Sequence, residues 1–316
     1  MEKLNNIINN KFQNSLTNKV LKVLMMDRTT RKNIIWATDE YISLGEEYSP
    51  SNQISLSMAR GWHGSILQHQ IAKSDASKKE RKQKRAEVFT PAWICNLQNN
   101  LIDEDWFGRK DVFNITSQSG WISRKEKISF PAKRSKTWKK YIDTKRLEIT
   151  CGEAPYLVSP YDVVTGEEIP VPSRIGLLDR KMRIVNENTL TEDEWLKWTL
   201  RAFQSVYGYE FQGDNLMIAR LNLLITFADN LQYSWNRDAT ENELHQISKV
   251  ISWNIWQMDA MTGTIPYGTP VQTYEPIDLF EPQPNSISSA HQQPLCKIMD
   301  WRAKQSFIFK ELANTK

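Results

Sequence analysis

The sequence predicts an α/β protein with a helical N-terminal region. In residues 87–316, short β-branched segments alternate with segments of helical periodicity, which favours a sheet covered by helices. The 316 residues are 40% apolar and 25% charged, which is typical of a globular protein of one large or two smaller domains and excludes a disordered or fibrous chain. We therefore expect a helical region over 1–72, a basic linker over 73–86 and an α/β domain over 87–316.

Cysteine and histidine usage limits the kinds of site. The three cysteines (Cys95, Cys151 and Cys296) lie far apart, which excludes a disulfide framework and indicates a reducing compartment. Four scattered histidines without a Cys-x-x-Cys pair give no zinc-ligand spacing, so no metal is expected. No apolar run is long enough for a membrane span, and the first residues lack the apolar core of a signal peptide, so we expect a cytoplasmic protein without a membrane partner.

Local patterns predict the elements in chain order. Apolar residues at helical spacing from Phe12 to Leu24 indicate the N-terminal helical region, and Thr90 with Pro91 is typical of an N-cap and a first helical residue. Prolines among β-branched residues predict short strands and turns over 146–176. Further expected elements are a helix over Ala92–Asn100, a helix from Thr191 to a stop at Gly208, helices over Asn215–Phe227 and Glu241–Trp253, and a strand pair over Cys296–Leu312.

Positive charge is concentrated in two stretches. The net charge is only +4, but residues 73–85 contain seven Lys or Arg, and a basic insertion at 121–146 interleaves cations with aromatic residues. This composition suits a polyanion whose phosphates pair with Lys and Arg and whose bases stack on rings. A solvated helix face is the alternative. The candidate nucleic-acid-binding residues are Lys133, Arg134, Lys136, Lys139 and Lys140.

Carboxylates are expected at the ends of two strands. Residues 147–157 predict a strand ending at Glu148 and then a turn of small residues, as nucleotide sites use where backbone N–H groups approach a ligand. A second strand ends at Glu210, where a carboxylate can accept both ribose hydroxyls of an adenosine cofactor. Asp259 can accept a hydrogen bond from an adenine amino group. The alternatives are a tight turn between strands for residues 147–157, and a solvent-exposed acid or a helix cap for each carboxylate.

The order of four motifs resembles a known family. Residues 89–91 read Phe-Thr-Pro, 148–152 read Glu-x-x-Cys-Gly, 208–210 read Gly-Tyr-Glu, and 254–259 read Asn-Ile-x-x-x-Asp. This order resembles the amino-methylating DNA methyltransferases, most closely the adenine-N6 modification subunits of bacterial or phage restriction–modification systems. The pattern Asp-Pro-Ala-Cys-Gly-Ser-Gly-Ala-Phe-Leu of that family aligns with Glu148–Leu157 without a gap.

The resemblance implies a Rossmann-like fold that binds S-adenosylmethionine. It implies methyl transfer to adenine N6 in DNA, with DNA and a restriction or specificity subunit as partners. The implied cofactor contacts are Phe89, Thr90 and Pro91 at the methionine end, Glu148, Cys151, Gly152 and Ala154 in the turn, Glu210 at the ribose and Asp259 at the adenine.

The catalytic motif of the family, Asn/Asp/Ser-Pro-Pro-aromatic, has no full match. In the family an Asn or Asp polarises the amino group of a flipped adenine that stacks on the aromatic residue. Residues 264–267 (Thr-Ile-Pro-Tyr) lack the polar acceptor, and Ser-Pro-Tyr at 159–161 directly follows the cofactor turn. Asp300 and Trp301 follow a predicted strand where the motif order places the catalytic loop, so they are the candidate acceptor and stacking platform. A strand-end acid beside a packed tryptophan is the alternative.

The sequence therefore predicts an adenine-specific DNA methyltransferase-like protein. A catalytically inactive relative that binds DNA or a partner restriction subunit is the first alternative, because the proline motif is missing. A metal-dependent nuclease needs clustered carboxylates and a lysine, commonly after Pro-Asp, and the sequence has no Pro-Asp dipeptide. An RNA-binding structural protein explains the basic stretch but not the ordered motifs.

Overall fold

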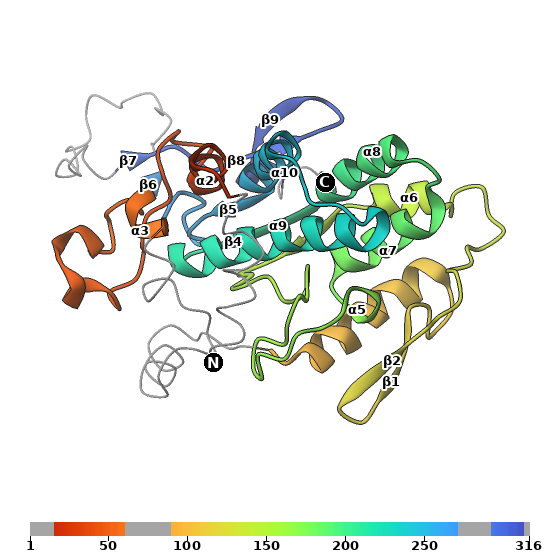
Figure 1. The fold of residues 1–316 in the computed structure, drawn as a ribbon. Helices are drawn as coiled ribbons and strands as arrows, with labels where there is room; N and C mark the ends of the chain where they lie inside the picture. The colour runs from red at the N-terminus through yellow and green to blue at the C-terminus, as the bar shows by residue number, and fades with distance from the viewer. Residues whose placement is uncertain (1–15, 61–89, 271–291, 313–316) are drawn as a thin grey trace, which may run out of the picture.

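A parallel sheet of three strands lies at the centre of the structure, a computed structural model that describes residues 16–60, 90–270 and 292–312 (Figure 1). The strands β3 (Arg146–Glu148), β4 (Val206–Glu210) and β5 (Ile255–Gln257) run in the order β3-β4-β5. Glu210 pairs with Gln257, and Glu148 pairs with Gly208, two residues before the end of β4. The carboxyl ends of the strands therefore lie at one edge, and the expected α/β class is confirmed.

Helices pack on this sheet and on one another. The helix α9 (Gly213–Trp235) lies against β4 and β5 and is flanked by α10 (Glu241–Asn254) and α7 (Leu177–Asn188), as Figure 1 shows. All of its first fifteen residues are buried, because neighbours cover it on several sides. The other helices within residues 90–270 are α5 (Ala92–Phe107), α6 (Trp138–Asp143) and α8 (Glu192–Phe203), together with the 3-10 turn η5 (Val171–Ser173).

Smaller strand pairs lie outside the central sheet. The pairs are the antiparallel hairpin of β1 (Asn114–Ser117) and β2 (Gly120–Ser123), the parallel pair of β6 (Thr269–Pro270) and β7 (Gln292–Gln293), and the antiparallel hairpin of β8 (Lys297–Asp300) and β9 (Gln305–Ile308), which continues into α11 (Phe309–Leu312). The β8–β9 hairpin confirms the strand pair expected over 296–312. Its end packs on the sheet, where Phe309 contacts Tyr209 and Trp256.

The N-terminal region has less helix than its periodicity predicts. Between α2 (Asn18–Met25) and α3 (Leu56–Arg60), only the 3-10 turns η1 (Ile42–Leu44) and η2 (Glu46–Tyr48) are helical. The chain between them hydrogen-bonds to the α/β part instead: Ile35 and the side chain of Gln257 exchange two bonds of 2.9 Å, and Gly213 N donates to Trp36 O at 2.8 Å. Residues 1–15, 61–72 and the expected linker 73–86 lie outside the described residues.

Two helix ends differ from the sequence prediction. Thr191 caps α8 as expected, but α8 ends at Phe203, because Gly208 lies in the middle of the fully buried strand β4. The helix α5 extends to Phe107, and its first N–H, that of Ala92, donates to Asp162 Oδ2 at 2.7 Å rather than to Thr90.

In the part of the chain that the structure describes, no helix combines the length and apolar character needed to cross a membrane.

Candidate functional site

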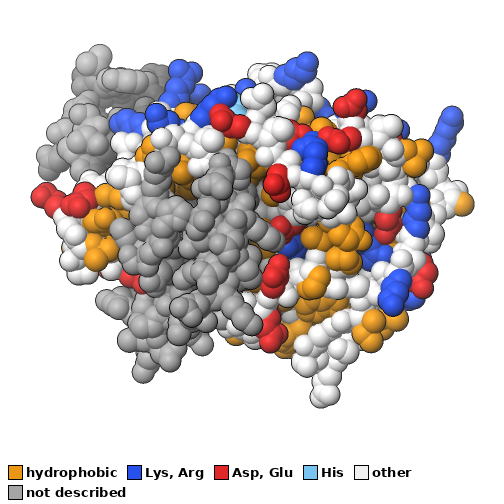
Figure 2. Space-filling view, viewed as in Figure 1, with side chains coloured by type: hydrophobic (Ala, Val, Ile, Leu, Met, Phe, Trp, Pro, Cys, Tyr) orange, Lys and Arg blue, Asp and Glu red, His pale blue; other side chains and the backbone are white. Residues whose placement is uncertain are grey.

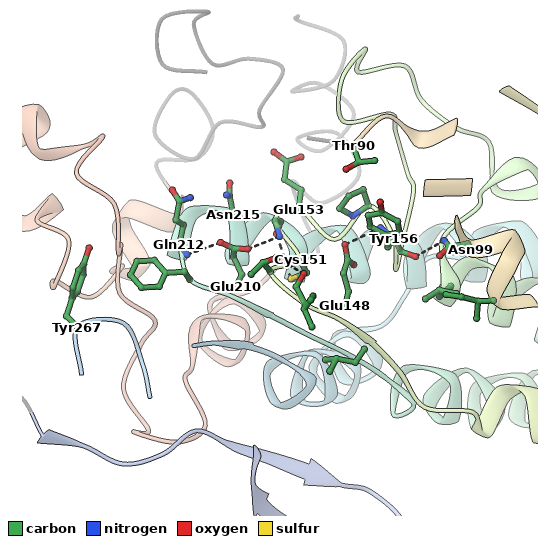
Figure 3. A pocket seen from close by; sticks show the side chains of 18 residues that line it. Thr90, Asn99, Glu148, Cys151, Glu153, Tyr156, Glu210, Gln212, Asn215 and Tyr267 are labelled. Carbon is green, nitrogen blue, oxygen red and sulfur yellow. Dashed lines mark hydrogen bonds between the residues drawn. The ribbon is translucent and has the colours of Figure 1, made fainter. Parts of the chain in front are cut away.

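A cavity of about 860 Å³ opens at the carboxyl ends of β3 and β4 (Figure 3). Its wall combines the turn after β3, the end of β4, the start of α9 and residues of α5. Small-molecule sites have volumes of about 300–1,000 Å³, so the cavity has the size of a cofactor site. Among the predicted cofactor contacts, it is lined by Thr90, Glu148, Cys151, Gly152 and Glu210.

Glu210 is held by backbone N–H groups at the centre of the cavity. Gly152 N donates to Glu210 Oε2 at 2.8 Å, and Gln212 N donates to Oε1 at 3.1 Å. Gly152 has a φ of +53°, a left-handed conformation that favours glycine. Because both donors are backbone groups, the orientation of the carboxylate is fixed by the turn and by the entry into α9.

Glu148 lies in the cavity wall, and only one of its two carboxyl oxygens is hydrogen-bonded within the part of the chain that the structure describes. Its Oε1 accepts the N–H of Tyr156 at 3.4 Å, whereas Oε2 is buried and has no hydrogen-bond partner among the described residues. Burial raises the pKa of this carboxyl well above its usual value, and the charge of Glu210 raises it further, against the lowering effect of backbone N–H groups. A buried carboxyl oxygen without a partner is a position where a ligand donor gains a hydrogen bond.

The turn after β3 is packed at Cys151 and Ala154, which are both buried. Cys151 N donates to Tyr209 O at 2.9 Å, and burial raises the pKa of its thiol, so Cys151 packs the seam between β3 and β4. Ala154 is fully buried with a φ of +64°, at the position where the family pattern has glycine, and it does not line the cavity. Gly152 is therefore part of the cavity wall, whereas Ala154 is buried in the protein.

The two ends of the cavity are chemically different. Figure 3 shows Thr90, Tyr156 and Asn99 at one end and Tyr267 at the other, with Glu210 between them. At the second end the Phe211 and Tyr267 rings meet edge to face, with centroids 5.7 Å apart. Pro91, rather than Thr90, is the N-cap residue of α5, and Pro91 does not line the cavity. Phe89 lies outside the described residues.

Tyr267 is a cavity residue that the sequence interpretation did not assign. It belongs to the Thr-Ile-Pro-Tyr segment, which was set aside for lack of a polar acceptor. The Pro-Tyr dipeptide was the signal that could have found it. Asp259, expected at the adenine, does not line the cavity; its Oδ1 accepts the N–H of Met261 at 2.8 Å and closes a local turn.

Asp300 and Trp301 lie at the opposite edge of the sheet. Asp300 Oδ2 accepts from Lys145 Nζ at 3.0 Å, and Lys145 directly precedes β3. Trp301 Nε1 donates to Asn254 Oδ1 at 2.8 Å, and Asn254 directly precedes β5. Because these contacts are at the amino ends of the strands and the cavity is at the carboxyl ends, the structure does not bring the expected catalytic pair to the cavity.

The basic insertion is exposed, but its aromatic residues are packed. Lys133, Arg134, Lys139 and Lys140 are exposed, whereas Lys136 Nζ donates to Trp106 O at 2.5 Å and lies 4.7 Å from that ring. Trp138 packs on Trp198 with centroids 4.8 Å apart. The four exposed cations are therefore available to phosphates, while Trp138 contributes to the core rather than to base stacking.

Comparisons with known proteins found no similar protein. No protein-family model matches the chain, and no curated protein or solved structure is significantly similar to it. What supports a function for this chain is therefore the geometry of the cavity and the order of the motifs.

Proposed function

We propose that the chain binds S-adenosylmethionine in this cavity, as a methyltransferase-like component of a cytoplasmic restriction–modification system. The observation that carries the proposal is the Gly152–Glu210 hydrogen bond, which joins a small-residue turn after one parallel strand to an acid at the end of the next. In open α/β sheets, nucleotide ligands bind at the carboxyl ends of the strands. The backbone of a glycine-containing turn then lies close to the ligand, and an acid binds the ribose. A Rossmann-like methyltransferase fold is part of this proposal.

The residues present fit the cofactor. The volume of about 860 Å³ suits a ligand of this size, and Glu148 Oε2 offers a buried acceptor near the turn. We place the ribose at Glu210, the methionine moiety toward Thr90 and Glu148, and the adenine ring against Tyr267 at the other end of the cavity. Tyr267 thus takes the adenine-end role for which the sequence favoured Asp259.

Methyl transfer to adenine N6 of DNA is the reaction proposed for this site. When bound, S-adenosylmethionine supplies an electrophilic methyl group. The chain orients it through Glu210 and the turn, and the exposed cations Lys133, Arg134, Lys139 and Lys140 are the proposed contacts to DNA phosphates.

A cofactor-binding subunit without its own catalytic pair is the second candidate. The position of Asp300 and Trp301 at the amino ends of the strands favours it. The outward face of α5 gives independent support, because Trp93, Leu97 and Leu101 are exposed at a spacing of four residues. Hydrophobic side chains are visible where α5 lies in the space-filling view (Figure 2). Exposed apolar stripes of this kind mark protein-interaction surfaces.

Two measurements on one preparation test the proposal. Calorimetric titration with S-adenosylmethionine is expected to give a dissociation constant in the micromolar range, about 1–100 μM. Transfer of a labelled methyl group from the cofactor to DNA then separates the candidates. Binding with transfer supports the enzyme, binding without transfer supports the cofactor-binding subunit, and absence of binding by the folded protein contradicts both.

A further inference from the structure

A second cavity, of about 310 Å³, adjoins the first, and Tyr267 lies in the wall of both. Its wall comes from two parts of the chain: residues 30–53 of the N-terminal region, and residues 265–268 together with Gln293. The volume is at the lower limit of about 300 Å³ for small-molecule sites. None of the lining residues is acidic, and the one charged residue among them is Lys32.

The local hydrogen bonds determine which atoms of two amides are available. Asn33 Nδ2 donates to Ile54 O at 2.9 Å, and Gln53 Oε1 accepts the backbone N–H of Asn33 at 3.0 Å. These bonds assign the oxygen and nitrogen of each amide. Asn33 Oδ1, an acceptor, and Gln53 Nε2, a donor, make no hydrogen bond to another described residue. The cavity wall thus offers one acceptor and one donor from neighbouring residues.

This combination matches the chemistry of a nucleotide. Each nucleobase presents donors and acceptors side by side on its edge, and Asn and Gln amides pair with such edges. The Tyr267 ring, about half exposed at 49%, offers a surface on which a base can stack. The ammonium group of Lys32 is exposed and forms no ion pair with another described residue, so it is free to contact a phosphate.

The segment that carries these groups is held rigidly. Asp27 N donates to Lys32 O at 2.8 Å, and Asp27 Oδ2 accepts the N–H of Thr30 at 2.7 Å. An antiparallel bridge pairs Ile35 with Gln53, and the Gln257 side chain fixes the backbone of Ile35. A site on a fixed backbone loses little entropy when a ligand binds.

We propose that the second cavity binds a nucleotide, with its base on Tyr267 and against Asn33 Oδ1 and Gln53 Nε2, and its phosphate at Lys32. The nucleotide is either free or part of a single DNA strand, since both carry the same groups. The site makes the N-terminal region a nucleotide-reading element, and of the groups proposed to bind the nucleotide it shares only the Tyr267 ring with the first cavity.

The test uses two probes on the full chain. Adenosine 5′-monophosphate is titrated calorimetrically in the presence of excess S-adenosylmethionine, and a fluorescein-labelled single-stranded oligonucleotide is titrated by fluorescence anisotropy. Gln53→Glu replaces the free donor by an acceptor, and Lys32→Gln removes the cation. Gln232→Glu makes the same charge change as Gln53→Glu at an exposed position near the end of α9 and is the matched control.

We expect at least one probe to bind, and Gln53→Glu and Lys32→Gln each to weaken its binding by about fivefold or more, against less than about twofold for Gln232→Glu. Binding of the mononucleotide identifies a free nucleotide as ligand, and binding of the oligonucleotide alone identifies a DNA strand. Binding of neither probe, or equal binding by the three variants, overturns the proposal. The affinity for S-adenosylmethionine, measured on the same variants, reports on the first cavity separately, because neither Lys32 nor Gln53 lines it.

Discussion

The backbone N–H of Gly152 donates to Glu210 Oε2 at 2.8 Å, across 58 residues of sequence. One bond thereby couples the turn after β3 to the acid at the end of β4. A change in the conformation of the turn changes the orientation of the acid, so the two motifs form one structural unit at the cavity.

The close approach of Gly213 to the N-terminal region predicts a large effect of a methyl group. A Cβ at Gly213 would lie 1.9 Å from Ile35 O, a backbone atom that also accepts from Gln257. We expect Gly213→Ala to lower the free energy of unfolding by about 3 kcal/mol, measured by urea denaturation. Gly120→Ala is the control, because its Cβ would meet only Ser117 Oγ at 3.5 Å. Equal stability of the two variants would mean that the N-terminal region does not pack at the start of α9.

The buried carboxyl of Glu148 predicts a pH-dependent stability. Its pKa is raised by burial above the ordinary 4.5, so the folded state retains a proton that the unfolded chain releases as the pH rises. Stability is therefore lost above the unfolded pKa, and Glu148→Gln removes this loss. We expect the variant to be more stable than the wild type by about 1–2 kcal/mol at about pH 8 and equally stable at about pH 4.

The matched control for Glu148→Gln is Glu167→Gln, at an exposed position. Urea denaturation at both pH values is expected to show a change below about 0.5 kcal/mol for Glu167→Gln. A Glu148→Gln difference that is the same at both pH values would contradict the raised pKa.

Tyr267 is expected to contribute to cofactor affinity through its ring. The Phe211–Tyr267 contact places the ring at the proposed adenine end of the cavity. We expect Tyr267→Ala to weaken binding of S-adenosylmethionine by about tenfold, since stacking on an aromatic side chain contributes about 1–3 kcal/mol. Tyr267→Phe keeps the ring and is expected to bind within about twofold of the wild type. If both variants bind like the wild type in calorimetry, the adenine lies elsewhere.

Asp300 is expected to stabilise the fold without affecting the cofactor. Backbone N–H groups of Ala303 and Arg302 and the ammonium of Lys145 lower the pKa of Asp300 to about 2. Because the folded pKa is below the unfolded value of 3.8, this stabilisation is present at neutral pH and is lost as the pH falls from about 4 toward 2. We expect Asp300→Asn to lower the free energy of unfolding by about 1 kcal/mol at about pH 7, with a smaller difference below about pH 4.

Cofactor affinity of the same variant provides the second readout. Asp300 contacts residues at the amino ends of the strands, so Asp300→Asn is expected to bind S-adenosylmethionine within about twofold of the wild type. A much weaker binding with an unchanged stability would return Asp300 to the site.

The sequence predicts the two acids of the cavity because their signal is local. Glu148 and Glu210 each end a strand and precede a turn or a helix, and parallel strands bring such ends to one edge. The start of α8 and the extent of α10 are likewise local, since each begins at a capping threonine.

The sequence does not predict the features of the fold that depend on contacts between residues far apart in the chain. The helical periodicity of the N-terminal region is realised in α2, but the chain around Ile35 takes its hydrogen bonds from Gln257. Motif order favoured Asp300 over Tyr267, whereas the structure puts Tyr267 at the cavity and Asp300 at the other edge. Which edge a hairpin reaches depends on the path of the chain after β5, and local patterns carry no information on that path.

The most direct test is calorimetric titration of S-adenosylmethionine into the wild type and into two variants, each lacking one acid. Glu210 lines the cavity with its carboxylate held by Gly152, whereas Asp259 closes a turn outside it. We expect Glu210→Ala to weaken binding by about a hundredfold, because two hydrogen bonds to a charged acceptor are lost, and Asp259→Ala to bind within about twofold of the wild type. Wild-type affinity in a folded Glu210→Ala protein, or no binding by the wild type, would show that Glu210 does not hold S-adenosylmethionine in this cavity.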